Sequence, residues 1–115
     1  MRAFLEPLDR LNEIGKLNIC LRKETGLQMI SGCIDSQKPH LIYGIGREFP
    51  YKIIVTFNEQ RAREIYEEYL FFDRQVVYYP AKDILFYQSD LRGNVLTRER
   101  ILALKRIAEG GRVTL

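Results

Sequence analysis

The residues whose types and spacing could bind a phosphate lie at positions 32–39, which read GCIDSQKP. A phosphate-binding loop (P-loop) has glycine, four residues, glycine, lysine and serine or threonine. Its backbone amides surround the phosphates, its lysine neutralises their charge, and its hydroxyl holds Mg²⁺. Gly32 and Lys38 stand at the spacing of this pattern. A glycine–lysine pair at this spacing is common, so the pair alone could also be a chance match.

Three residues of the same loop argue against a working site. Gln37 replaces the second glycine, and it cannot easily take the positive φ that glycine takes freely. Pro39 replaces the hydroxyl residue, so it removes an amide donor and supplies no ligand for Mg²⁺. Asp35 adds a negative charge where phosphates would lie. The sequence therefore predicts a degenerate phosphate loop, with no catalytic residue, no bound cofactor and no metal in this domain.

The elements that would position this loop follow from the hydrophobic pattern. Strands alternate with helices, which predicts parallel pairing through right-handed crossovers. The expected fold is α/β, a three-layer sandwich with a small parallel sheet, P-loop-like topology and a degenerate phosphate loop. We expect an N-terminal helical segment at 1–26 and an α/β domain at 27–115. Strands are expected at 27–32, 51–57, 75–79 and 112–115, and helices at 1–26 (or two, with a break near Gly15), 39–47, 58–72 and 97–109.

The side chains predict which faces of these elements are buried. The apolar run 51–57 is nearly continuous, which is typical of a parallel strand covered on both faces. Asn58 is expected to cap the helix that follows it, with Arg63 and Glu67 pairing on its exposed side. Residues expected to point inward are Ala62, Ile65, Tyr69 and Phe72 on that helix, and Ile101, Leu104 and Ala108 on the last one.

Composition excludes several classes of protein. The chain has 115 residues, 46% of them hydrophobic and 29% charged, as in one ordinary globular domain. Its net charge of +3 is too balanced for the basic face of a typical nucleic-acid binder. Cys20 and Cys33 lie far apart, and we expect them to be reduced and buried. No signal peptide or membrane span is visible, so the protein is expected to be cytoplasmic.

Four blocks in order resemble the N-terminal module of the bacterial transcription-repair coupling factor (Mfd) family, which is itself similar to the first domain of UvrB. The blocks are MISGCIDSQK at 29–38, IIVTFNEQRAREIYEEY at 53–69, VVYYPAKDILFYQSD at 76–90 and RERILALKRI at 98–107. The third block is the most distinctive. The likeness covers roughly residues 27–115, without the long tyrosine-rich insertion that forms the DNA-probing hairpin of UvrB.

The resemblance implies a parent protein that is an ATP-dependent DNA translocase. Such a protein displaces stalled RNA polymerase and recruits UvrA for nucleotide excision repair. ATP and Mg²⁺ would act in its downstream motor domains, and RNA polymerase and double-stranded DNA would bind downstream domains. UvrA would bind through an adjoining subdomain. This chain would then be a fragment that acts as a non-catalytic scaffold, held against the remaining domains of the same chain.

An apolar patch in the loop after the third strand is the expected interdomain contact. Its residues are Ile84, Leu85, Phe86 and Tyr87. Two other functions stay open at this stage. One is a functional nucleotide-binding (ATPase) domain, and the other is a nucleic-acid-binding module in which aromatic side chains stack on bases.

Overall fold

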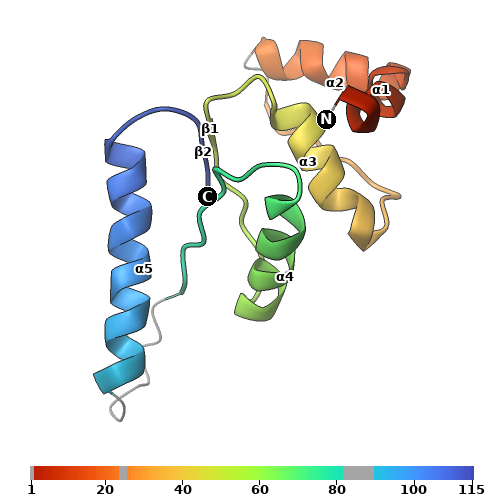
Figure 1. The fold of residues 1–115 in the computed structure, drawn as a ribbon. Helices are drawn as coiled ribbons and strands as arrows, with labels where there is room; N and C mark the ends of the chain where they lie inside the picture. The colour runs from red at the N-terminus through yellow and green to blue at the C-terminus, as the bar shows by residue number, and fades with distance from the viewer. Residues whose placement is uncertain (1, 24–25, 82–89) are drawn as a thin grey trace. The chain divides into compact units, whose positions relative to one another are not determined.

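The computed structural model of the chain describes residues 2–23, 26–81 and 90–115. These residues form a mostly helical protein with a very small parallel sheet, a mixture of α and β structure (Figure 1). Two compact units, Met1–Glu48 and Phe49–Leu115, make up the chain. The helices are α1 (Arg2–Asp9), α2 (Asn12–Arg22), α3 (Lys38–Gly46), α4 (Glu59–Leu70) and α5 (Asp90–Ala108), and the strands are β1 (Tyr51–Lys52) and β2 (Val113–Thr114); a short 3-10 turn, Asp35–Gln37, precedes α3.

The first unit contains α1, α2 and α3. The break between α1 and α2 falls at residues 10–11, and Gly15 lies inside α2, so the expected break near Gly15 is wrong. Leu8 and Ile14 are buried in this unit. A Cβ added at Gly44 would lie 2.5 Å from Leu8 Cδ1, so α1 and α3 approach each other closely there. Arg47 of the α3 end donates two hydrogen bonds to the Asp9 carboxylate, at 2.8 and 3.2 Å.

The expected first strand, 27–32, is not a strand. Leu27 and Met29 are 97% and 89% exposed. In the described ranges no strand pairs with this segment. A strand needs neighbouring backbone to hydrogen-bond with, because its own N–H and C=O groups cannot reach each other. An apolar run alone therefore did not suffice to predict the strand.

The second unit is built around three parallel stretches of extended backbone. β1 pairs in parallel with β2, with Tyr51 opposite Val113 and Lys52 opposite Thr114. On the other side of β2, Val76 forms a parallel bridge with Thr114. The expected strand at 75–79 is thus reduced to a single bridge, whereas the expected parallel pairing is confirmed. Residues 113–115 lie in the middle, between 51–54 and 76–77.

One face of the β1 stretch is not covered. Ile53, Val55 and Phe57 are 73%, 86% and 86% exposed, while the intervening Ile54 and Thr56 are half-buried. This alternation is the pattern of a strand with one solvent-facing side. The expectation that both faces of 51–57 are covered is therefore wrong, because α4 packs on only one of them.

Helix α4 follows the sequence-based expectation closely. The Asn58 side chain accepts a hydrogen bond from the Arg61 backbone N–H at 2.7 Å, which confirms the cap. Ile65 and Tyr69 are buried, as expected, whereas Ala62 and Phe72 are only half-buried and the helix ends at Leu70, before Phe72. Arg63, however, pairs with Glu59 at 2.9 Å and not with Glu67. The observed order, with the acid four residues before the base, is the one that suits the helix dipole better.

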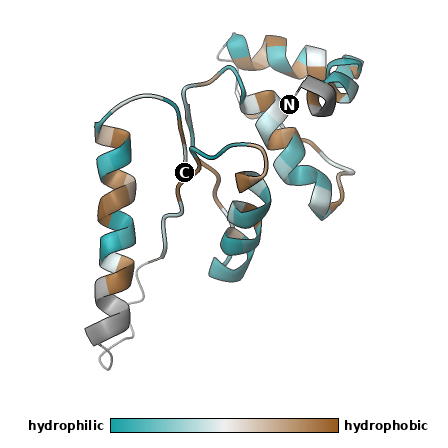
Figure 2. Ribbon diagram, in the orientation of Figure 1, coloured by the Kyte–Doolittle hydropathy of each residue, from teal (hydrophilic) through white to brown (hydrophobic). Residues whose placement is uncertain are grey.

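Helix α5 begins at Asp90, well before the expected start near 97, and its buried side differs from the expected one. Ala103 is fully buried, whereas Ile101 and Leu104 are 58% and 54% exposed and Ala108 is exposed. On the same helix, the Arg100 side chain contacts Tyr79 and the Pro80 carbonyl. Figure 2 shows apolar and polar residues alternating along α5. Gly110, with φ of +77°, follows the end of the helix, as expected.

The remaining expectations concern the patch, the cysteines and the membrane. The patch formed by Ile84, Leu85, Phe86 and Tyr87 lies outside the described residues. Neither Cys20 nor Cys33 is in a disulfide, and both are half-buried instead of buried. None of the helices in the described parts of the chain has the length and apolar character needed to cross a membrane.

Candidate functional site

The degenerate phosphate loop joins an exposed extended segment to α3. Gly32 has φ of +82°, a conformation that favours glycine. The 3-10 turn at Asp35–Gln37 follows, and α3 begins at Lys38 with Pro39 in its first turn. Gln37 has φ of −83°, so the second glycine position of the motif has an ordinary helical backbone here. The loop therefore turns directly into the helix.

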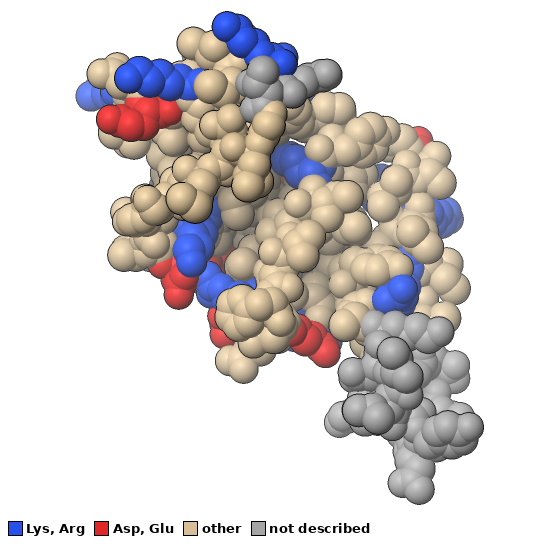
Figure 3. Space-filling view, turned by 180° about the vertical axis from the view of Figure 1, so that it is seen from behind, with Lys and Arg blue, Asp and Glu red and all other residues tan. Residues whose placement is uncertain are grey.

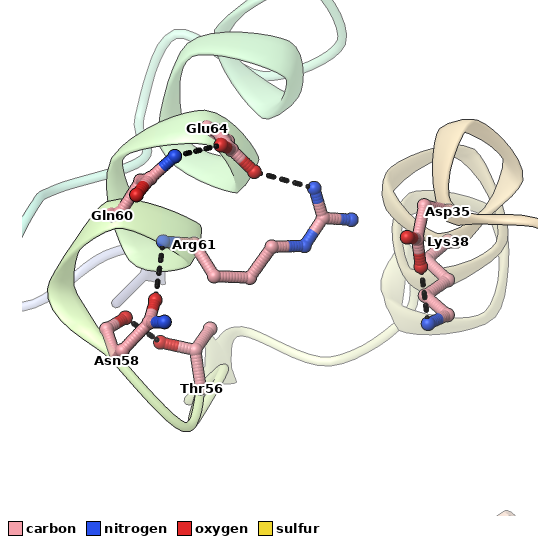
Figure 4. Close-up of polar contacts among 7 residues, drawn as sticks. All are labelled: Asp35, Lys38, Thr56, Asn58, Gln60, Arg61 and Glu64. Carbon is pink, nitrogen blue, oxygen red and sulfur yellow. Dashed lines mark hydrogen bonds and ion pairs between the residues drawn. The ribbon is translucent and has the colours of Figure 1, made fainter.

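The polar groups of this loop bond to one another (Figure 4). Lys38 Nζ lies 2.6 Å from Asp35 Oδ1, as an ion pair. The Gln37 side-chain oxygen accepts a weak hydrogen bond from the Ile34 backbone N–H, at 3.4 Å. Pro39 is fully buried and offers no donor. The lysine charge and one loop amide are thus already engaged with groups of the loop itself.

A second polar turn follows the β1 stretch in the other unit, where strand passes into helix (Figure 4). Thr56 Oγ1 donates a hydrogen bond to the Asn58 carbonyl oxygen at 2.9 Å. Arg61 forms an ion pair with Glu64 at 2.9 Å, and the Arg61 side chain is only 15% exposed. These contacts fix the start of α4. Asn58 caps the helix, and the charge of Arg61 is neutralised by Glu64, so both contacts stabilise α4.

The tyrosines at the end of the third extended stretch are engaged by neighbouring side chains. The Tyr78 ring lies 5.8 Å from the Tyr66 ring of α4, and the Arg63 guanidinium lies 4.9 Å from the Tyr78 ring centre. Burial raises the pKa of the Tyr78 hydroxyl, and the Glu59 carboxylate acts in the same direction. Tyr78 thus has two partners within the protein, as in an internal packing contact.

Tyr79 is held from the other helix. The Arg100 guanidinium of α5 lies 4.3 Å from the Tyr79 ring centre and donates a hydrogen bond to the Pro80 carbonyl at 2.8 Å. Because Tyr78 and Tyr79 are consecutive residues of extended backbone, their side chains point to opposite sides. One tyrosine therefore meets α4 and the other meets α5. To stack on bases, Tyr78 would have to give up its contacts with α4 and Tyr79 its contact with Arg100.

A pocket of about 240 Å³ lies between α4 and the extended stretches. It is lined by residues 53–56 and 76–79, by Leu115 and by the inner side of α4, including Ile65 and Tyr69. Most of these side chains are apolar. The pocket can accommodate an apolar group and offers no cluster of acids or bases for chemistry.

A partly buried polar cluster beside the sheet was not expected from the sequence. Lys52 Nζ lies 3.7 Å from Asp73 Oδ2, and the Thr114 hydroxyl lies 3.5 Å from the same oxygen. Burial lowers the pKa of Lys52, while the nearby Asp73 carboxylate partly opposes this shift. The three residues come from distant parts of the chain, and no sequence spacing would have connected them. We assign the cluster a structural role, because it links β1, β2 and the end of α4.

On the face seen in Figure 3, Lys and Arg side chains lie among Asp, Glu and uncharged side chains without forming one continuous basic area. On α5, Lys105 pairs with Glu109 at 3.7 Å. In the parts of the chain that the structure describes, no group of three or more metal-binding side chains comes together.

Comparisons with family models, curated proteins and solved structures gave no match for this chain. The residues of the degenerate loop, Gly32, Gln37, Lys38 and Pro39, do come together at the start of α3, as their sequence positions require. Two of them contact other residues of the loop, since Lys38 pairs with Asp35 and Gln37 accepts a hydrogen bond from the Ile34 backbone N–H.

Proposed function

We propose that this chain is a non-catalytic scaffold domain, similar to the N-terminal module of a transcription-repair coupling factor. One observation carries the proposal. Lys38, the residue that would neutralise a phosphate, is paired with Asp35 at 2.6 Å within the same loop. A nucleotide would have to displace this pair and approach the Asp35 carboxylate, which repels phosphate oxygens. With Pro39 in place of the hydroxyl residue, Mg²⁺ would also lack its usual ligand.

The arrangement of the second unit supports the finer fold that goes with this function. Its extended stretches run parallel, and α4 and α5 flank them on opposite sides in Figure 1. We infer a three-layer α/β sandwich around these parallel stretches, of which the observed sheet is a small part. The capped turn at Asn58 agrees with the second block of the family resemblance, which has an asparagine between strand and helix.

In this proposal the domain holds other parts of a larger cytoplasmic protein in place. The neighbouring subdomain would contact UvrA, and downstream domains would use ATP and Mg²⁺ and engage RNA polymerase and double-stranded DNA. The domain itself binds no cofactor or metal. Its proposed role is to hold the neighbouring domains in position.

Calorimetry with Mg-ATP distinguishes this scaffold from an ATPase domain. We expect no measurable heat of binding for the wild-type chain or for the matched variant Lys38→Ala. Micromolar affinity in the wild type that is lost in Lys38→Ala would contradict the scaffold proposal, because it would show that the loop still binds phosphate.

The gene provides an independent test of the family assignment. The reading frame beyond codon 115 should encode the UvrA-contacting subdomain and then the motor domains of a translocase. A stop codon directly after this position, or an unrelated downstream domain, would contradict the assignment but would leave the calorimetric result valid.

A further inference from the structure

No further inference is drawn: the strongest candidate, the mostly apolar pocket of about 240 Å³ between α4 and the ends of the extended stretches, carries nothing, because nothing in the described parts of the structure shows what fills it and its Tyr78 ring already packs against Tyr66 and Arg63.

Discussion

Ile53 and Ile54 are consecutive residues of one strand, and the structure gives them opposite roles in stability. Ile54 is half-buried, lines the pocket beside α4 and bonds through its N–H to Leu115. Ile53 is 73% exposed on the open side. Replacing a fully buried isoleucine with alanine costs about 2–5 kcal/mol. For the half-buried Ile54 we expect Ile54→Ala to lower the free energy of unfolding by about 1–2 kcal/mol, and Ile53→Ala to change it by less than about 0.5 kcal/mol.

Thermal unfolding followed by circular dichroism measures this difference. The Ile54→Ala melting midpoint should fall by roughly 5–15 °C, given the usual relation between free energy and midpoint for a domain of this size. Equal destabilisation by both substitutions would refute the one-sided strand, and an unchanged midpoint for Ile54→Ala would show that α4 does not cover this residue.

Three further predictions follow from single contacts. Asn58→Ala should destabilise the chain by about 1 kcal/mol, because α4 loses its cap, whereas Asn58→Gly should cost only a few tenths of that amount; denaturant titration compares them. The pKa of Lys52 is lowered by burial, so the unfolded state binds more protons between the folded pKa and 10.5. Stability should therefore rise with pH in that window for the wild type relative to Lys52→Met, and identical pH profiles would contradict this. The double substitution Gln37→Gly with Pro39→Thr should show no ATPase activity, since hydrolysis also needs a metal-holding carboxylate and an arginine; turnover above background in a phosphate-release assay would show that these groups are present.

Some local signals in the sequence predicted local structure, although the expected break near Gly15 and the expected Arg63–Glu67 pair, which are also local, were wrong. Asn58 before a helix-forming run gave the α4 cap, because capping depends only on the asparagine oxygen and an amide three residues later. The glycines after α5 marked its end for a similarly local reason. The contacts within the degenerate loop also connect residues a few positions apart. Such features need no knowledge of the rest of the fold.

Features that depend on distant partners were predicted less well, although the parallel pairing of distant stretches was expected and is observed. The apolar run 27–32 has the composition of a strand, but no described strand pairs with it. On α5 the buried residue is Ala103, while Ile101 is exposed and Arg100 contacts Pro80 and Tyr79. These outcomes depend on contacts between residues far apart in the sequence, and hydrophobic periodicity does not encode which partner is available.

The middle position of 113–115 affects how the second unit can form during synthesis. The described backbone hydrogen bonds between extended stretches all run through these residues, which join 51–54 on one side and 76–77 on the other. Both outer stretches are made by the ribosome before the stretch that links them. Until residues 113–115 emerge from the exit tunnel, neither outer stretch has a strand to hydrogen-bond with. Pairing 51–54 with 113–115 also closes a long loop of chain, which is slow. Ribosome-bound chains that end before 113 should therefore remain protease-sensitive between 51 and 79, and protection should appear only once the middle strand has emerged.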